Sequence, residues 1–528
     1  MRQALPKELR DVISSNNNLS RYLLSLSKEQ AFTDRSWLYE DREPDDVLQA
    51  WKEHLAVLEN GNTFEREIFQ FDTSQEKKWG PQGGHEAFEE IYQSIVAPQF
   101  EDSPVPKAFT SELWNQAKAE TVAMFKRAGI RALRPAAYTS VIDNMRARDT
   151  LESNSGWPSF ARRNVEDVKQ QAIQDAENGK WKTYPAIALF RRYNNKTRLV
   201  WMYPMSVNLV EASFFQPLQT AILKTHLAKE FFAPWVGFEQ VRVRVTEEYQ
   251  SGRFVSASDF SATDQHFRLS TSLEVYDVLA ELFMPQYREP LKESIQCMHN
   301  IPLVISPTEY IVGEHGVASG SNWTNFIETV FDFILSNYVE LLSSNSQEVH
   351  YWSGLYGIGD DMSWFCNKYD PKFSEWLSDV GQSVGQEINA EKVTNDPDKV
   401  KTLQRLFQRG YRRPDGLLRG VYSTIRALKS SVYPEKFHNP KLWSSDMFCA
   451  RQFMILENCV DHPLFEDFVK FVCAGQKDLI PFAHKTRAQL DEINRKTKLL
   501  PGLNTTYNQE RRESSLADFA SIRIARNL

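Results

Sequence analysis

The sequence lacks an uninterrupted apolar run long enough to span a bilayer, and its first residues lack the apolar core of a signal peptide. Its five cysteines are odd in number, scattered along the chain and without a C-x-x-C pair. That usage indicates neither a disulfide framework nor a zinc site. We therefore expect a reduced, intracellular protein with no membrane segment. The 528 residues contain no internal repeat, and their number predicts about two to four subdomains.

The chain also lacks an excess of basic residues. Its net charge of −7 argues against a general nucleic-acid coat. Basic residues are nevertheless concentrated in two runs, because residues 180–198 carry six Lys or Arg and no acid, and residues 401–429 carry eight against one Asp. A solvated face explains either run alone. Two such runs on either side of an acidic cluster suit an internal nucleic-acid channel.

The order of patterns predicts an α+β fold with a small sheet inside much helix. Residues 1–75 and the chain after about residue 430 read as mostly helical, and a breaker-rich loop follows the first of these stretches. The remaining signals are β-prone runs at 186–190, 198–202 and 254–258, a long helix at 322–342 and a hairpin at 349–365.

Two acidic segments carry the chemistry. Asp259 follows a β-prone run, and Asp264 comes five residues later. Asp360 and Asp361 stand between apolar residues and follow Gly359, which fits two strands joined by a tight turn. A lone Gly-Asp-Asp is usually a surface turn. Adjacent aspartates at a hairpin tip repel each other, however, so a fold keeps them there when a cation compensates.

The acidic cluster predicts a magnesium site. Carboxylate oxygens suit Mg²⁺, with Mn²⁺ as a possible substitute. If Asp259 lies beside Asp360, two ions about 3.5–4 Å apart can bridge the cluster. One ion would activate an attacking 3′-hydroxyl and the other would stabilise leaving pyrophosphate, which is nucleotidyl transfer.

Three further segments fit that chemistry. A Gly/Ser loop at 313–322 opens a helix, and Thr324 and Asn325 in its first turn could present polar groups to a site; a capped surface helix is the alternative. Basic residues between 191 and 198 could hold a triphosphate. Lys392 could protonate pyrophosphate, although by itself it reads as a surface lysine.

The order of these segments resembles the motifs of viral RNA-dependent RNA polymerases over about residues 150–430. The matching positions are Asp259 and Asp264 (motif A), Ser319, Gly320, Thr324 and Asn325 (motif B), Asp360 and Asp361 (motif C), Lys392 (motif D), Arg409 and Arg419 (motif E), Lys196 and Arg198 (motif F), and Ser155, Gly156 and Pro158 (motif G). The form of motif B is most similar to the polymerases of picobirnaviruses, with partitiviruses next. In one departure, Glu328 stands where many positive-strand enzymes have Asn. We therefore expect Asn325 to complete ribose recognition.

The resemblance implies a closed right hand with fingers, palm and thumb around a small antiparallel palm sheet. The expected division is an extension bridging fingers and thumb at 1–75, fingers at 76–250, palm at 251–272, a fingers insertion at 273–312, palm at 313–428, and thumb with a tail at 429–528.

The resemblance also implies roles for the matched residues. It implies that Asp259, Asp360, Asp361 and Lys392 are catalytic and that the three acids bind metal. Nucleotide contacts fall to Asp264, Ser319, Thr324, Asn325, Lys196 and Arg198, and RNA contacts to Ser155, Gly156, Pro158, Gly320, Arg409 and Arg419. The implied partners are RNA template and product, NTPs and a viral capsid protein, in the virion interior and the host cytoplasm.

Two rival functions remain to be separated. A reverse transcriptase shares the acid triad but carries an aromatic steric gate where Asp264 stands, and a non-enzymatic RNA-binding or capsid-associated protein needs no intact triad. Two further points stay open. Tyr433, Phe437 and Trp443 could form a priming platform or belong to the core, and the tail at 516–528 could restrain RNA or pack on the thumb.

Overall fold

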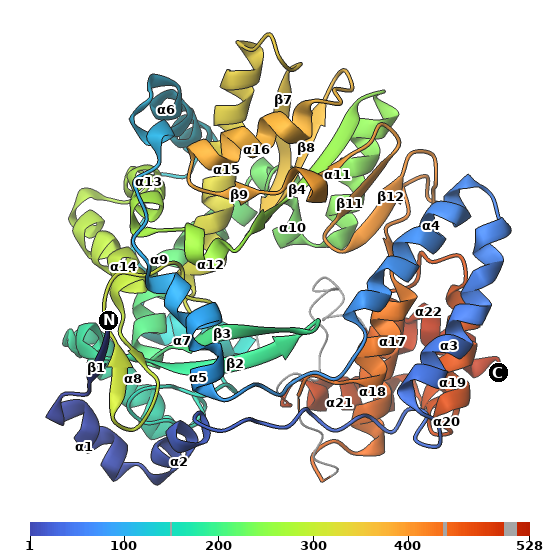
Figure 1. Ribbon diagram of the computed structural model, residues 1–528, viewed down its shortest axis with the longest axis horizontal. Coiled ribbons are helices and arrows are strands. Elements are labelled where there is room, and N and C mark those ends of the chain that lie inside the picture. The colour runs from blue at the N-terminus through green and yellow to red at the C-terminus, as the bar shows by residue number, and fades with distance from the viewer. Residues whose placement is uncertain (148–149, 437–440, 501–514) are drawn as a thin grey trace.

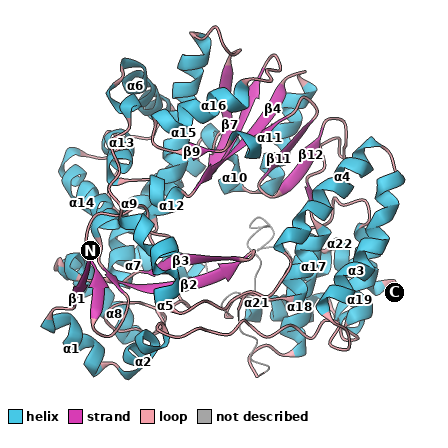
Figure 2. Ribbon diagram, in the orientation of Figure 1, coloured by secondary structure: helices cyan, strands magenta, loops and turns pink. Residues whose placement is uncertain are grey.

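The computed structural model describes residues 1–147, 150–436, 441–500 and 515–528. Their elements form a ring, in which a sheet-centred half faces a helical lobe (Figure 1). The described residues form three sheets among many helices, and the β2–β3 hairpin projects toward the middle of the ring (Figure 2). The mixture confirms the α+β fold class expected from the sequence.

The central sheet has the strand order β10-β4-β8-β7, with β9 also paired to β4. Its strands are β4 (Phe254–Ser261), β7 (Trp352–Ile358), β8 (Asp361–Cys366), β9 (Glu387–Ile388) and β10 (Thr394–Asn395). Helix α15 (Trp323–Ser344) packs against β7 and α6 (Glu112–Arg127). Almost every residue from Phe326 to Val339 is buried, because a helix that is apolar nearly all round needs partners on every side.

The hairpin sheet has the order β1-β6-β5-β2-β3. Its strands are β1 (Arg2–Ala4), β2 (Ala186–Tyr193), β3 (Lys196–Met202), β5 (Leu303–Val304) and β6 (Glu309–Ile311). Strands β2 and β3 meet at Asn194 and Asn195, whose φ values are +54° and +60°. Asparagine tolerates that left-handed backbone, so a two-residue turn closes the hairpin. The hairpin points across the ring toward α17 (Thr424–Val432) (Figure 1).

A small sheet links the central sheet to the helical lobe. It consists of β11 (Lys399–Thr402), β12 (Arg405–Gln408) and β13 (Val421–Tyr422) in sequence order. Helix α11 (Phe238–Gln250) shares a core with it, in which Phe238 packs on Phe407.

The helical lobe combines both ends of the chain. Its C-terminal helices are α17, α18 (Ser445–Glu457), α19 (Phe465–Gly475), α20 (Leu479–Ala483), α21 (Arg487–Thr497) and α22 (Ala520–Arg526). Helices α3 (Pro44–Leu55) and α4 (Thr63–Thr73) share their hydrophobic core. The buried Asp72 carboxylate accepts hydrogen bonds from Ser423 Oγ (2.6 Å) and Ile425 N (3.0 Å), and it contacts His462 Nε2 at 2.9 Å. Residues 38–71 therefore belong physically to this lobe.

The first helices pack elsewhere. Residues of α1 (Lys7–Ser15) and α2 (Asn17–Ser25) join the core of the hairpin-sheet side. The remaining helices outside the lobe are α5 (Phe88–Ile91), α7 (Tyr138–Ala147), α8 (Glu166–Glu177), α9 (Met205–Leu223), α10 (Ala233–Val236), α12 (Thr263–His266), α13 (Leu269–Ala280), α14 (Arg288–Asn300) and α16 (Phe373–Ser383). Of these, α10 packs on β7 and α16 packs on β9 of the central sheet. The N-terminal segment thus reaches both sides of the ring, although the exact domain boundaries stay predictions. Within the described ranges, no helix is long and apolar enough to cross a membrane.

The C-terminal tail packs on the helical lobe. This arrangement is one of the two alternatives expected from the sequence; the other was a tail that restrains RNA. Leu516, Phe519, Ile522 and Ala525 are buried in the lobe core. The Glu457 carboxylate accepts hydrogen bonds from Ala520 N (3.0 Å) and Ser521 Oγ (2.7 Å).

Replacing Ile522 with Ala should destabilise this lobe. Ile522 is fully buried, so the shorter side chain leaves a cavity, at a cost of about 2–4 kcal/mol in the free energy of unfolding. Thermal and urea unfolding measure the change. Arg523→Ala is the matched control, because Arg523 is exposed and its loss should change stability by less than about 0.5 kcal/mol. Equal stability of both variants would contradict the observed packing of the tail.

Candidate active site

Three carboxylates meet at the end of the central sheet. Asp259 on β4 lies directly opposite Asp361 at the start of β8, and Asp360 occupies the turn before β8. Carboxylate oxygens of the three residues lie within 4.8 Å of one another. The expected approach of the β4 strand to the Gly-Asp-Asp hairpin is therefore confirmed. Strand β4 continues to Ser261, two residues beyond the point at which the sequence suggested that it ends.

Helix α15 fixes the hairpin tip. Thr329 Oγ1 accepts a hydrogen bond from Gly359 N at 2.9 Å. Gly359 has a φ of +57°, and an added Cβ there would lie 2.8 Å from Asn325 Nδ2. Glycine is required at this position by both the left-handed backbone and the close helix. Asn325 therefore lies against the turn that carries the acids.

The three acids repel one another at the end of the sheet, where Asp259 and Asp360 are exposed and Asp361 is half-buried. Burial, followed by the charge of Asp360, raises the pKa of Asp259 to about 6. Burial also raises the pKa of Asp361, and the negative charges of Asp360 and Asp259 raise it further. The positive charges of Lys392, Arg198 and Lys78 oppose the shift at Asp259. Because the donors are all oxygens and their ionisation is costly without a counter-charge, the cluster fits a hard divalent cation.

The acids line a central cavity of about 620 Å³. Its other charged lining comes from every part of the ring: Lys78, Arg191, Arg198, Arg426, Glu435, Lys436 and Arg451. Both basic runs of the sequence contribute, the first through Arg191 and Arg198 and the second through Arg426. An acidic patch within a mostly basic wall suits a polyanion that reacts at the acids.

A smaller cavity of about 210 Å³ opens beside Asp259 and Asp361. Its basic residues are Lys78, Lys392, Lys401 and Arg426. Burial lowers the pKa of Lys78 to about 8, with Arg426 and Lys77 adding to the shift. In the part of the chain that the structure describes, neither Lys78 nor Lys401 forms an ion pair. The sequence did not single out Lys78 or Lys401, because only the fold brings them to Asp259.

The Gly/Ser loop lies against the end of β3. Ser319 Oγ donates to the Leu199 carbonyl at 3.3 Å, and an added Cβ on Gly320 would lie only 1.6 Å from the Trp201 carbonyl oxygen. Thr324 Oγ1 donates to the Ala318 carbonyl at 2.5 Å, so it stabilises its own loop. Among the motif B candidates, Asn325 is the residue that the structure places against the hairpin tip.

Asp264 lies apart from the acid triad, on the short helix α12. Burial raises its pKa to about 6; Asp360 adds to this shift, while Arg198 and Lys196 oppose it. Asp264 thus shares the electrostatic environment of both basic candidates without belonging to the metal-binding group. Glu328 is buried nearby, and burial raises its pKa well above the usual range, with further contributions from Asp360 and Asp264.

The predicted template loop is folded tightly on itself. Ser155 N donates to the Ala161 carbonyl at 2.6 Å, and Ser155 Oγ accepts from Ala161 N at 3.2 Å. Gly156 has a φ of +67°, and a Cβ there would lie 2.4 Å from the Tyr203 carbonyl oxygen. The loop containing Pro158 therefore closes over the end of β3, next to the Gly/Ser loop.

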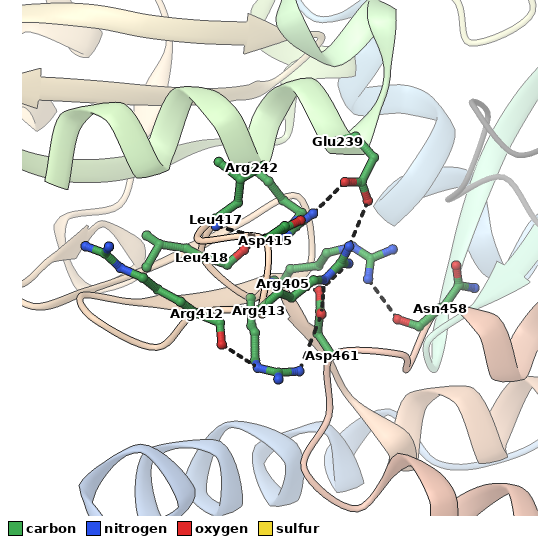
Figure 3. A network of polar contacts seen from close by, with 12 residues as sticks. Glu239, Arg242, Arg405, Arg412, Arg413, Asp415, Leu417, Leu418, Asn458 and Asp461 are labelled. Atoms are coloured by element: carbon green, nitrogen blue, oxygen red, sulfur yellow. Dashed lines mark hydrogen bonds and ion pairs between the residues drawn. The ribbon is translucent and has the colours of Figure 1, made fainter. Parts of the chain in front are cut away.

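The motif E arginines are engaged within the protein. Arg409 donates to the carbonyls of Tyr249, Arg253 and Pro397 at 2.9–3.1 Å, and Arg419 donates to the Arg412 carbonyl at 3.0 Å. Arg419 also lies 3.9 Å from Asp461, in a wider network in which Arg413 pairs with Asp461 of the helical lobe and with Glu239 of α11 (Figure 3). RNA contact by Arg409 and Arg419 stays a prediction, and their guanidinium groups are already occupied.

Two of the three aromatic candidates for a priming platform lie in different surroundings. Trp443 is buried yet lines the central cavity, whereas Tyr433 packs edge-on against Trp79. Phe437 lies outside the described residues.

Comparison with known proteins settles the class of this site. Residues 193–419 match the family model described as viral RNA-dependent RNA polymerase, a stretch that includes all three acids. A "potential RNA-dependent RNA polymerase" of human picobirnavirus (strain Human/Thailand/Hy005102/-) is 26% identical over 487 residues, covering 88% of this chain and 86% of the relative. The chain is an RNA-dependent RNA polymerase.

Solved structures show that the fold of this polymerase extends over its whole length. The crystal structure of the RNA-dependent RNA polymerase of a human picobirnavirus matches with a TM-score of 0.81 at 22% identity, covering 99% of this chain and 100% of that one. An insertion-loop deletion mutant of such a polymerase matches with a TM-score of 0.78, at the same identity and coverage. The expected resemblance to picobirnavirus polymerases is confirmed.

Proposed function

We propose that this polymerase replicates and transcribes a segmented, double-stranded viral RNA genome by nucleotidyl transfer from NTPs. The observation that carries the proposal is the acid triad of Asp259, Asp360 and Asp361 at a cavity whose walls are mostly basic. Similarity to picobirnavirus polymerases supports the type of genome, a capsid-protein partner, and action in the virion interior and host cytoplasm.

The acids would hold the ions that this reaction needs. Asp259, Asp360 and Asp361 present carboxylate oxygens alone, which favours Mg²⁺ over softer metals. Two bound ions would activate the 3′-hydroxyl of the growing strand and stabilise the charge of the leaving pyrophosphate. The α15 helix keeps the hairpin tip in place through Thr329, so the carboxylates are positioned before substrate arrives.

Basic side chains would guide the triphosphate. Arg198 on β3 lines the central cavity together with the acids, and Lys392 lines the small cavity beside Asp259. In the reaction the 3′-oxygen bonds to the α-phosphorus as the bond to the β-phosphate oxygen breaks. Lys392 would donate a proton to that oxygen, and Lys78, Lys401 and Arg426 would attract the departing pyrophosphate into the small cavity.

The lobes of the ring would act as the parts of a closed right hand. The central sheet corresponds to the palm, the hairpin-sheet side to the fingers, and the helical lobe to the thumb. Contacts between the β2–β3 tip and α17 support a closed arrangement, because Lys429 Nζ donates to Asn194 Oδ1 and Arg426 Nη2 donates to Tyr193 Oη at 3.0 Å.

The product of the reaction separates this function from its rivals. Wild-type protein is incubated with an RNA template, Mg²⁺ and labelled ribonucleotides or deoxyribonucleotides. We expect RNA product from ribonucleotides. A DNA product would indicate a reverse transcriptase, and the absence of product in a folded, RNA-binding preparation would indicate a non-enzymatic RNA-binding protein.

Asp264→Ala should reduce the preference for ribonucleotides. The Asp264 carboxylate can accept a hydrogen bond from the ribose 2′-hydroxyl, directly or through Asn325 and Ser319. Loss of that bond costs about 1–3 kcal/mol, which lowers the ratio of ATP to dATP efficiency about 5- to 150-fold. Single-nucleotide incorporation at fixed Mg²⁺ measures the ratio. Equal losses for ATP and dATP would show that Asp264 is structural and that another group reads the sugar.

A further inference from the structure

Glu211 is a buried carboxyl group that the mechanism above does not use. It lies on α9 with only 1% of its surface exposed. Its oxygens accept hydrogen bonds from Ser321 Oγ, from Asn322 N at 3.1 Å and from Asn208 Nδ2 at 2.9 Å. Two of these donors belong to the Gly/Ser loop, so one carboxyl group ties that loop to α9.

Asn208, one turn earlier on α9, connects Glu211 by hydrogen bonds to both the Gly/Ser loop and the template loop. Its Nδ2 also donates to the Gly320 carbonyl at 3.2 Å, and its own carbonyl accepts from Asn322 Nδ2 at 3.1 Å. Asn208 Oδ1 accepts from Arg163 Nη2 at 2.7 Å, and Arg163 Nε donates to the Asn154 carbonyl at 3.1 Å. Hydrogen bonds therefore run without a break from the template loop through Arg163, Asn208 and Glu211 to the Gly/Ser loop.

Both loops also press on the same short backbone segment. Gly320 leaves no room for a Cβ against the Trp201 carbonyl, and Gly156 leaves none against the Tyr203 carbonyl. Packing alone could place two loops against this segment. Burying the Glu211 carboxyl group, linked through Asn208 to the half-buried Arg163 guanidinium group, costs free energy that apolar packing would not, so its presence points to a requirement for one specific loop geometry.

We propose that Glu211 is a positioning residue that holds the end of the Gly/Ser loop, residues 318–322, in register with the template loop, residues 154–163. The inference rests on the proposed function, because these loops are the ones expected to meet the incoming nucleotide and the template. Glu211 itself does not need to touch either substrate. Its effect passes through the Ser321 and Asn322 bonds to the backbone that carries Ser319 and Gly320.

The electrostatics of the network give the proposal a pH signature. Burial raises the pKa of Glu211 to about 7, against the opposing effects of Ser321, Asn322, Asn208 and Arg163. Burial lowers the pKa of Arg163 to about 10, so Arg163 stays charged near neutral pH. Tyr203 and Cys297 also face Glu211, and burial raises the pKa of each, so both stay neutral there. Above about pH 7 the ionised carboxylate accepts strongly from both loop donors; below it the bound proton removes one acceptor.

Glu211→Gln tests the proposal with little change of volume. The amide offers one acceptor and places an N–H against donors, so the loop loses a charge-assisted bond. We expect kcat/KM for single-nucleotide incorporation to fall about 10- to 100-fold. The wild-type activity profile should show an inflection near pH 7 that the variant lacks. In the double variant Glu211→Gln/Ser321→Ala, the second substitution should add little.

Asp175→Asn is the matched control. Asp175 is also buried, on α8, and it accepts hydrogen bonds from Gln171 Nε2 at 2.9 Å and Tyr184 Oη at 2.7 Å. This substitution should lower stability without changing nucleotide selection or the pH profile. If the control reproduces the kinetic loss, or if the Glu211 and Ser321 effects simply add, Glu211 has only a general structural role.

Hydrogen exchange in the RNA-free protein provides a readout that does not depend on activity. Glu211→Gln should speed exchange in peptides from both loops, 154–163 and 318–322, while exchange in the helical lobe stays unchanged. Unchanged exchange in the two loops would overturn the inference even if the wild-type protein polymerises RNA. A wild-type protein that makes no RNA product would instead overturn the proposed function, whatever the exchange shows.

Discussion

Asp360→Asn should abolish nucleotide incorporation while leaving the fold and RNA binding nearly unchanged. Asp360 lies in the hairpin turn, and its carboxylate oxygens are within 4.8 Å of those of the other two acids, so it could contribute to both ions. An amide has the same shape but cannot supply the negative charge that binds and balances the cations. Incorporation on a primed RNA template in Mg²⁺ gives the rate, with thermal unfolding and RNA affinity measured on the same preparation.

Asp→Asn substitutions at other positions provide the comparison for that result. Asp259→Asn should behave like Asp360→Asn, and Asp361→Asn should be milder. Asp143→Asn is the surface control, because Asp143 is exposed on α7, where it forms an ion pair with Arg146 at 3.1 Å. A folded Asp360→Asn protein that keeps more than a few percent of wild-type turnover would remove Asp360 from the metal site.

Lys392→Leu should slow the chemical step much more than it weakens nucleotide binding. Lys392 lines the small cavity beside Asp259, where the leaving pyrophosphate is expected, and general acid catalysis typically contributes about 10²–10⁴-fold. Rapid-quench kinetics across pH, with a proton inventory, separate the chemical step from binding.

Lys392→Arg distinguishes proton donation from charge. Arginine keeps the positive charge but gives up a proton far less readily, so it should restore nucleotide affinity more fully than rate. Lys372→Leu removes an exposed lysine that lines neither cavity and should leave both nucleotide affinity and rate unchanged. An unchanged single-turnover rate in Lys392→Leu would make Lys392 an ordinary surface residue.

The sequence predicted the centre of the site because its signals there are local. An apolar run before Asp259 and apolar residues on both sides of Gly359, Asp360 and Asp361 indicate strands and a turn from short-range pattern alone. The helix expected at 322–342 appears as α15, Trp323–Ser344. Strand β1 escaped prediction, since Arg2–Ala4 is short and gains its hydrogen bonds from β6, about 300 residues away.

The parts that the sequence missed depend on long-range packing. Helices α3 and α4 read correctly as helical, but nothing local indicates that Trp51 and Phe71 complete the core of the C-terminal lobe. Lys78 and Lys401 look like ordinary surface lysines until the fold brings them to the small cavity. The sequence around Glu211 does not indicate its role either, because the three hydrogen-bond donors to its carboxylate come together only in the folded chain.

Motif matching located the loops, and the structure adds the partners that their side chains have within the protein. Thr324 stands in the expected loop, yet its hydroxyl bonds to the Ala318 carbonyl. Arg409 stands in the expected segment, yet its guanidinium group bonds to three backbone carbonyls. A motif conveys the path of the backbone, whereas the partners of a polar side chain depend on neighbours that the motif does not contain.

Single-nucleotide extension of an RNA primer annealed to an RNA template tests the central claim most directly. Each of the four NTPs is supplied alone, with Mg²⁺ or with EDTA, on templates that differ only in the templating base. We predict extension by the complementary NTP alone, in Mg²⁺ and not in EDTA, by wild-type protein and not by Asp360→Asn. Extension that ignores the templating base, that persists in EDTA, or that survives loss of Asp360 would contradict a metal-dependent RNA-directed RNA polymerase built on this acid triad.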